Sequence, residues 1–313
     1  MFEAKKFIER SVGEIKSTIG KERAIIAVSG GVDSFVAATL ASKAIPDQLH
    51  IVYVDNGLMR KNETEKVKEV AEKLGVNLNV IDGKDQFLDA LKGIVDPEEK
   101  RKIIGREFIN IFEEEAKKHN VKFLVQGTIA PDWIESGGMG RDTIKSHHNV
   151  GGLPENMDLK LCEPLRELYK HEVRELGKEL GLPETVHQRQ PFPGPGLGVR
   201  IVGEITSENI RIVQNACDIV ETEIDNADME RPWQYFAAML SSKTVGVRGD
   251  ERSYQYTVIV RAVRSLDGMT ANFSHIPFKV LEKISTRITN EIPEVGRVAY
   301  DITNKPPGTI EME

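Results

Sequence analysis

The sequence predicts an α/β protein in which a doubly wound parallel sheet is followed by a smaller α+β domain. Over the first 125 residues, short apolar runs alternate with amphipathic stretches, the pattern of parallel strands connected by helices. A glycine-rich hexapeptide, SGGVDS, separates the first apolar run from the first amphipathic stretch. A second segment rich in glycine and proline, PFPGPGLG, cannot continue either pattern. We therefore expect two domains, at residues 1–190 and 191–313.

The first domain is expected to contain four strands and three connecting helices. Three of the strand runs are continuously apolar, as in strands buried on both faces, and VNLNVI alternates as in a strand with one polar face. The strands are expected at residues 24–28, 51–54, 76–81 and 123–125. Helices are expected, from apolar residues at helical spacing, at residues 32–43, 63–74 and 99–118.

Regular periodicity is lost over residues 131–161, a segment that contains five glycines. Irregular segments longer than about 12–15 residues are usually binding loops or disordered. We expect a lid, because reactive side chains are concentrated there. A helix at residues 171–180 should follow, ended by Gly181 with Pro183 just beyond. Residues 191–198 should be irregular and form the domain boundary.

The second domain is expected to have the order strand, helix, strand, strand, helix, strand. This order is typical of a split βαβ arrangement in a two-layer domain. The elements are expected at residues 199–205, 207–224, 244–247, 254–263, 278–290 and 298–303.

Composition excludes several classes of protein. The formal net charge of −7 disfavours a protein devoted to nucleic acid, whose phosphates need a basic surface. No apolar run approaches the about 18 residues of a membrane span, and the N-terminus is polar. Two cysteines, Cys162 and Cys217, are too few for a disulfide framework or a cysteine-built zinc site. We expect a soluble cytoplasmic protein without a nucleic-acid or membrane partner.

The hexapeptide is the sharpest local signal for a binding site. Its glycines allow a tight turn, and the helix that follows offers unpaired amide groups to a phosphate. No lysine follows the glycines, so this is not the GxxxxGK[ST] loop. A carboxylate beside phosphates requires a bridging cation, so Asp33 implies Mg²⁺ if a nucleotide binds. The alternative is a glycine turn between a strand and a helix, capped by Ser29 and Ser34.

Two further motifs begin where expected strands end. VDNGLMR places Asp55 at the carboxyl edge of the sheet, where ligands bind in doubly wound folds, although Asn56 and Gly57 could form a simple turn and Arg60 a solvated cation. QGTIAPDWIES places Asp132 and Glu135 three residues apart. One helical turn would bring both carboxylates to one side, suited to a metal or an amine. A capping acid and a solvated glutamate are the alternative.

The expected lid contains IKSHHN, with Lys145 close to His147 and His148. Adjacent histidines point to opposite sides of an extended chain, so zinc is not expected. A mobile cation and two imidazoles suit a reaction that releases phosphate, because negative charge develops there. An exposed loop without function is the competing interpretation.

The C-terminal segment KPPGTIEME is unusual for a tail, because two prolines stiffen it. Tails normally fray, whereas a stiff tail is suited to docking into a pocket.

These motifs, in this order, resemble the ATP pyrophosphatase part of the GMP synthetase family, and the match covers nearly the whole chain. SGGVDS is shared with many amide-forming and tRNA-modifying enzymes of the adenine nucleotide alpha hydrolase-like fold. The specific part of the resemblance lies in IKSHHN, PFPGPGLG and KPPGTIE. One departure is Gln190, which stands where the family usually has histidine; the role of that side chain is therefore in doubt.

The resemblance implies ATP-dependent amination of XMP to GMP through an adenylated intermediate, with release of pyrophosphate and AMP. It implies that ATP binds at Ser29, Gly30, Gly31, Val32, Asp33 and Ser34, with Mg²⁺ at Asp33. Lys145, His147 and His148 would close over the phosphates, and Asp132 and Glu135 would organise the metal or the amine. The XMP residues implied are Arg60, Gln234, Arg297, Lys305, Ile310 and Glu311. On charge grounds, Arg297 and Lys305 are expected to bind the XMP phosphate.

The resemblance also implies partners. Family members that act alone carry a glutaminase domain before the hexapeptide, and here the hexapeptide begins at residue 29. We expect a separate glutamine amidotransferase subunit to supply ammonia, for which free ammonia could substitute, and a homodimer formed through the second domain. The alternatives are another adenylating enzyme, such as an NAD synthetase or a tRNA thiolase, and a nucleotide-binding regulatory protein without turnover.

Overall fold

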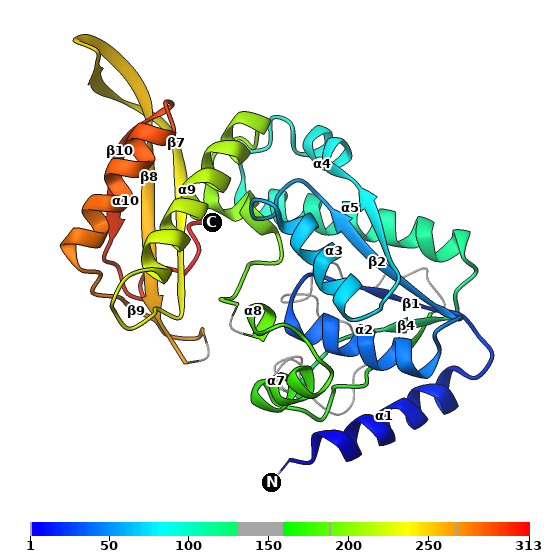
Figure 1. The fold of residues 1–313 in the computed structure, drawn as a ribbon. Helices are drawn as coiled ribbons and strands as arrows, with labels where there is room; N and C mark the ends of the chain where they lie inside the picture. The colour runs from blue at the N-terminus through cyan, green and yellow to red at the C-terminus, as the bar shows by residue number, and fades with distance from the viewer. Residues whose placement is uncertain (1, 131–158, 188, 267) are drawn as a thin grey trace. The chain divides into compact units, whose positions relative to one another are not determined.

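The computed structural model describes residues 2–130, 159–187, 189–266 and 268–313, which divide into two compact units (Figure 1). The first unit comprises Met1–Asp55, Asn62–Gly83 and Gly105–Arg189. The second comprises Asn56–Lys61, Lys84–Ile104 and Gln190–Glu313. Two short segments from the N-terminal part of the chain thus belong to the second unit.

The first unit is built on a five-stranded parallel sheet with the order β3-β2-β1-β4-β5. The strands are β1 (Ala24–Ala27), β2 (Leu49–Asp55), β3 (Leu78–Asp82), β4 (Phe123–Val125) and β5 (Lys160–Cys162). This order confirms the predicted doubly wound parallel sheet and its four predicted strands. β5 was not predicted: it is a three-residue edge strand, too short to show a periodic pattern, and its first two residues are exposed.

Helices cover both faces of this sheet. Alternation along the strands points Ile26, Tyr53 and Val125 to one face, where they form a core with apolar residues of four helices. These helices are α1 (Ala4–Ile19), α2 (Val32–Ala44), α3 (Glu63–Lys73) and α7 (Lys170–Glu179). α5 (Pro97–Lys118) lies against the other face, where its Glu115 contacts His50 of β2. The helices predicted at residues 32–43, 63–74, 99–118 and 171–180 are therefore confirmed within a few residues.

Three helices of the described ranges were not predicted. α1 precedes the first strand, and α4 (Lys84–Leu91) and α8 (Glu184–His187) are short connections. α4 and α8 have only one or two turns, and such a helix has too few apolar positions to establish a period of 3.6.

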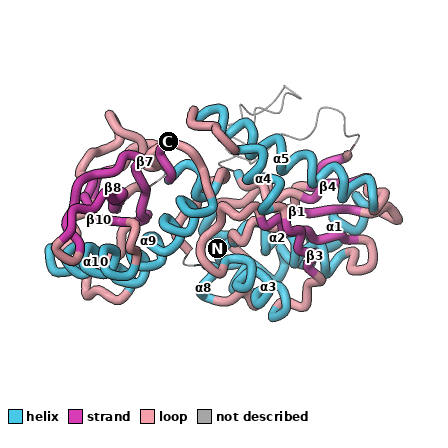
Figure 2. Tube along the Cα trace, turned by 90° about the horizontal axis from the view of Figure 1, so that it is seen from above, coloured by secondary structure: helices cyan, strands magenta, loops and turns pink. Residues whose placement is uncertain are grey.

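The second unit is a mixed sheet with two helices packed against it (Figure 2). Its strand order is β10-β8-β7-β6, with β9 also paired to β8. The strands are β6 (Ile201–Val202), β7 (Gln234–Arg248), β8 (Glu251–Arg264), β9 (Asn272–Phe273) and β10 (Val295–Asp301). The helices are α9 (Ser207–Asp225) and α10 (Phe278–Glu291). The predicted α+β domain is confirmed, and its elements follow the predicted order apart from the two-residue strand β9, which was not predicted.

The split βαβ arrangement is wrong. In a split unit another strand separates the parallel pair, whereas here β6 lies directly beside β7 and β8 lies directly beside β10. Two adjacent βαβ units are joined at the centre by the antiparallel β7–β8 hairpin. The hairpin turn uses Gly249 and Asp250, both at positive φ, as a two-residue turn requires.

Two local expectations in this unit also need correction. PFPGPGLG is partly regular, because a 3₁₀ helix covers Gly196–Arg200, and the strand predicted at residues 199–205 is reduced to β6. A side chain on Gly196 would meet the carbonyl oxygen of Leu58 at 2.3 Å, so this tight helical turn needs glycine there. β7 begins ten residues before the predicted start at Thr244. Its first residues are buried without alternation, so the sequence there lacks the period of two that indicates a strand.

None of the helices in the described ranges is both long and apolar enough to cross a membrane.

Candidate active site

The hexapeptide forms a closed loop between β1 and α2. Gly31 caps the start of α2, and Gly30 has φ +83°, a conformation that favours glycine. Ser34 Oγ donates to the carbonyl of Gly31 at 2.9 Å and lies 3.2 Å from the backbone nitrogen of Ser29, which donates to it. Ser29 Oγ accepts from the backbone nitrogen of Gly31 at 3.4 Å. The two serines thus bond to the loop itself and hold its backbone beside the helix N-terminus.

A buried ion pair holds this loop from behind. Arg189 donates to the carbonyl of Gly30 at 2.9 Å and to Glu63 Oε2 at 2.6 Å, and the Glu63 side chain is only 2% exposed. A side chain on Gly30 would lie 2.9 Å from Glu63 Oε1. The glycine therefore has a packing reason as well as a conformational one. Sequence reasoning missed Arg189 and Glu63 because they are 126 residues apart.

The third motif passes directly against the loop. A side chain on Gly127, just after β4, would lie 3.0 Å from the backbone of Asp33 and 3.2 Å from the nitrogen of Ser34. This close approach brings the start of QGTIAPDWIES to the first turn of α2. The expectation that strand ends gather polar motifs at one edge holds for these two segments.

The two carboxylate oxygens of Asp33 differ in their surroundings within the described part of the chain. Lys170, the first residue of α7, donates to Asp33 Oδ2. Asp33 Oδ1 is buried and has no hydrogen-bond partner among the described residues. A buried, orphaned carboxylate oxygen is the kind of ligand that Mg²⁺ prefers, so this position fits a divalent cation. Lys170 was not predicted, because only the fold brings it within reach of Asp33.

Asp55 ends β2, as predicted, and is buried there. Its Oδ2 accepts a hydrogen bond of 2.6 Å from Thr64 Oγ1 in the first turn of α3. This contact anchors α3 at the carboxyl edge of the sheet.

Five predicted catalytic residues lie outside the described residues: Asp132, Glu135, Lys145, His147 and His148. The predicted lid lies outside them as well, apart from its last residues, which include part of β5.

A second group of predicted residues meets in the second unit. Glu311 accepts two hydrogen bonds from the buried guanidinium of Arg200, at 2.9 and 3.0 Å, and a third of 2.7 Å from the Gln234 amide. The ring of Phe192 lies 5.1 Å from the Arg200 guanidinium and 4.2 Å from that of Arg60. We call these five residues, Arg60, Phe192, Arg200, Gln234 and Glu311, the Glu311 cluster.

The C-terminal tail docks on this unit, as its stiffness predicted. The buried Arg261 side chain donates to the carbonyls of Thr303, Thr309 and Ile310, at 2.5, 2.9 and 3.4 Å. At the end of the chain, Glu313 pairs with the buried ammonium of Lys100. These contacts hold Ile310 and Glu311 in place.

Gln190 bridges two elements of the second unit. Its side-chain nitrogen Nε2 donates to Glu221 at 2.9 Å, and its side-chain oxygen Oε1 accepts a hydrogen bond from the backbone nitrogen of Tyr235 at 2.8 Å. Arg60 also donates to Glu221, at 3.2 Å. The role of Gln190, left in doubt by the sequence, therefore includes support of the strand that carries Gln234.

The other two predicted XMP residues lie elsewhere. Arg297 is exposed on β10, where it pairs in register with Thr257 of β8. Lys305 donates to the carbonyl of Gly268 at 2.8 Å. Neither makes a hydrogen bond or ion pair with the Glu311 cluster within the described part of the chain.

Neither cysteine is an activated nucleophile. Burial raises the pKa of the Cys162 thiol to about 11. Burial also raises the pKa of Cys217, against the opposing effect of the nearby Arg200 guanidinium. This argues against the alternative of a thiolase with a catalytic cysteine.

Comparisons with known proteins agree with these observations. The chain matches the family profile of the PP-loop domain at residues 4–183 and that of the GMP synthase C terminal domain at residues 222–312. It is 61% identical over 309 residues to the B subunit of the glutamine-hydrolyzing GMP synthase of Pyrococcus horikoshii, covering 98% of this chain and 99% of that protein. It is 55% identical to the glutamine-hydrolyzing GMP synthase of Lactobacillus delbrueckii, covering 98% of this chain and 60% of that protein.

Among solved structures, NMN synthetase from Francisella tularensis is similar, with a TM-score of 0.50 and 19% identity over 67% of this chain and 85% of that one. This likeness shows the fold alone. The family profiles and the near full-length identity show more: the chain belongs to the family formed by the B subunits of glutamine-hydrolyzing GMP synthases.

Proposed function

We propose that this chain aminates XMP to GMP at the expense of ATP, with the hexapeptide loop as the site of the triphosphate. The observation that carries the proposal is the closed loop at the start of α2, with a buried carboxylate oxygen of Asp33 that has no partner among the described residues. In a chain of the GMP synthase family, this geometry suits a nucleotide that is cleaved to AMP and pyrophosphate.

The loop supports phosphate binding through its backbone and its two serines. The first turn of a helix has amide groups without partners inside the helix, and its dipole favours negative charge. Asp33 would hold Mg²⁺, which when bound supplies positive charge to the β- and γ-phosphates. Lys170, paired with Asp33 in this structure, adds a second positive charge beside the loop.

The proposed reaction has two steps. The C2 oxygen of XMP attacks the α-phosphorus of ATP, and pyrophosphate leaves. Ammonia then attacks C2, and AMP leaves with the oxygen. We assign Lys145, His147 and His148 to stabilising the departing pyrophosphate, because positive charge is needed where negative charge develops. Asp132 and Glu135 are assigned to orienting the amine and accepting its protons.

We propose the Glu311 cluster as the core of the XMP site. Glu311 and Gln234 offer a carboxylate and an amide held at fixed positions, which suits the donor and acceptor edge of a purine. Arg60 and Ile310 complete this group. Arg297 and Lys305 are proposed to bind the XMP phosphate. Because Arg297 is exposed on β10, we propose that it reaches the XMP site of a second copy of the chain.

A homodimer is proposed through the second unit. The outer part of the β7–β8 hairpin exposes Val245, Val247 and Tyr254, whose exposed fractions are 45%, 77% and 61%. Apolar side chains gathered on one hairpin commonly mark an interface between subunits.

We further propose a glutaminase partner that supplies ammonia, because the Pyrococcus relative is by its name one subunit of a glutamine-hydrolyzing enzyme. The reaction is placed in the cytoplasm, where free thiols such as Cys162 and Cys217 persist.

The direct test is incubation of the chain with ATP, Mg²⁺, XMP and ammonium, with GMP and pyrophosphate measured separately. We expect both products in equal amounts, and none when glutamine replaces ammonium without the partner. Formation of NAD when deamido-NAD replaces XMP would favour the NAD synthetase alternative. ATP binding without release of pyrophosphate would favour a regulatory protein.

A further inference from the structure

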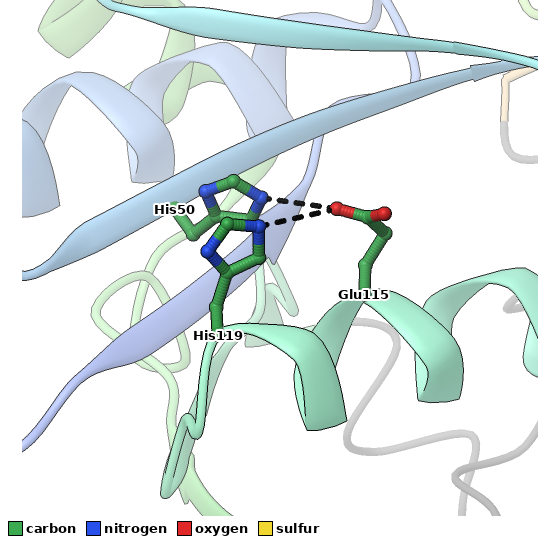
Figure 3. Close-up of side chains that lie close together, drawn as sticks. All are labelled: His50, Glu115 and His119. Atoms are coloured by element: carbon green, nitrogen blue, oxygen red, sulfur yellow. Dashed lines mark hydrogen bonds and ion pairs between the residues drawn. The ribbon is translucent and has the colours of Figure 1, made fainter.

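Two histidines and a glutamate meet on the side of the sheet covered by α5 (Figure 3). His50 is the second residue of β2, Glu115 lies in the last turn of α5, and His119 directly follows that helix. The Nε2 atoms of His50 and His119 lie 3.3 and 3.4 Å from Glu115 Oε2. The two imidazole rings lie with centroids 3.7 Å apart and their planes tilted by 33°, and both present Nε2 to the same carboxylate oxygen.

This cluster is separate from the ATP loop, although both belong to the first unit. His50 lies near the amino end of β2, and Asp55 ends the same strand at the carboxyl edge. Five residues of extended strand span about 17 Å. The loop chemistry therefore gives no reason for this grouping of side chains.

We propose that His50, Glu115 and His119 form a binding site for a divalent transition metal of the Zn²⁺ class. Zinc bonds to imidazole nitrogen and carboxylate oxygen are about 2.0–2.2 Å long, so neighbouring ligands on a tetrahedron lie about 3.4 Å apart. The nitrogen–oxygen separations of 3.3 and 3.4 Å match that edge, and the three ligand atoms all lie within 4.8 Å of one another. A fourth position would remain for water.

Neighbouring groups orient the carboxylate as they do around metal sites. Lys118 lies 3.2 Å from Glu115 Oε1, the oxygen that does not face the histidines, and Asn79 of β3 donates to Oε2 at 3.3 Å. Burial lowers the pKa of His50, which favours the neutral imidazole that binds metal. Although burial opposes it, hydrogen bonds from Lys118 and His50 lower the pKa of Glu115.

The ligand set also selects the ion. Imidazole nitrogen suits Zn²⁺, Ni²⁺ and Cu²⁺, whereas Mg²⁺ prefers oxygen ligands alone. A zinc ion here would tie the C-terminal end of α5 to the strand β2. It would therefore stabilise the scaffold from the edge opposite the nucleotide loop.

The test is zinc binding by the tag-free full chain, measured by calorimetry in the absence of nucleotide. We expect one Zn²⁺ per chain, a rise in the thermal unfolding midpoint with zinc that a chelator reverses, and visible absorption bands when Co²⁺ is the probe. Zinc should also slow hydrogen exchange at the end of α5. His119→Asn and Glu115→Gln should each weaken zinc binding by more than about tenfold.

Two controls keep the outcome decisive. His275→Asn removes an exposed histidine of the second unit and should leave zinc affinity unchanged. Asp33→Asn removes the other candidate cation ligand and should also leave it unchanged. The unfolding midpoints of His119→Asn and Glu115→Gln without metal must lie within a few degrees of that of the unmodified chain. If one of them does not, His50→Asn replaces it in the test. Absence of zinc binding, or binding lost only in Asp33→Asn, would overturn the proposal and leave a hydrogen-bonded triad.

Discussion

Arg200 and Glu311 form a two-bond ion pair across 111 residues of sequence, with Nε–Oε2 and Nη2–Oε1 distances of 2.9 and 3.0 Å. Arg200 is fully buried, whereas the Glu311 side chain is 17% exposed. The guanidinium also stacks over Phe236 at 4.1 Å. The C-terminal tail is thus attached to the centre of the second unit by a charge that has no access to water.

Glu311→Ala should destabilise the second unit by about 3 kcal/mol, because it leaves Arg200 buried and uncompensated. Arg200→Met should also destabilise it, and the double variant Arg200→Met/Glu311→Ala should recover much of the loss. Urea unfolding of the four proteins gives the coupling free energy. Additive effects of the two substitutions would show that the pair contributes nothing beyond its members.

Asp33→Asn should lower the rate of pyrophosphate release by about 10²–10³, the usual effect of removing a group that organises charge at the reacting phosphates. The shape and burial of the side chain are kept, so the unfolding midpoint should change little. The rate is measured by a coupled pyrophosphate assay, with Asp47→Asn, an exposed loop position, as the matched control. Equal rates for the two variants would remove Asp33 from the mechanism.

Lys170→Met should raise the KM for ATP by about tenfold while changing the KM for XMP much less. The substitution removes a positive charge that pairs with Asp33 at the loop, and a charge-assisted contact to phosphate is of that magnitude. Lys178→Met, on the last turn of the same helix, is the control. If both variants behave alike, the ion pair serves only to position α7.

Val247→Lys/Tyr254→Lys should convert the proposed homodimer into monomers without loss of secondary structure. Both side chains are exposed on the hairpin, so charges there cost little in a single chain and repel across an interface. Sedimentation velocity reports the mass. Leu266→Lys alters a fully exposed apolar residue outside the hairpin and should not affect association.

Cys162 should resist alkylation at pH 8 in the native chain. With its pKa raised to about 11, only about one thiol in a thousand is ionised at that pH. Mass spectrometry after iodoacetamide treatment should show modification only once urea unfolds the chain. Rapid native labelling would reopen the thiolase alternative.

The fold could be predicted where the local pattern and the tertiary environment agree. Strands β1, β2 and β4 are buried runs whose apolar residues satisfy both, and the hexapeptide marks the start of α2 within one residue. The start of β7 could not be predicted, because YFAAML is continuously apolar and is compatible with a helix or a strand equally well. Strand neighbours in the second sheet could not be predicted either, because the same element order is compatible with split and adjacent units.

The candidate site was predictable only in its local parts. The positions of Ser29 to Ser34 follow from one short motif. The partners Lys170, Arg189 and Arg200 carry no local signal, because each meets its acidic partner after more than 100 residues of chain. Such pairs form only between elements that the fold brings side by side. No short stretch of the sequence shows which elements these are.

The placement of Lys84–Ile104 in the second unit has a consequence for how the chain can be divided. Lys100, from that segment, forms an ion pair with the side-chain carboxylate of Glu313. A gene cut at the apparent boundary near residue 190 would therefore separate a buried ammonium from its partner and leave both fragments with exposed apolar surface. Shuffling of modules between related enzymes should succeed only with exchanges that carry Asn56–Lys61 and Lys84–Ile104 together with the C-terminal part, so that the whole second unit is transferred intact.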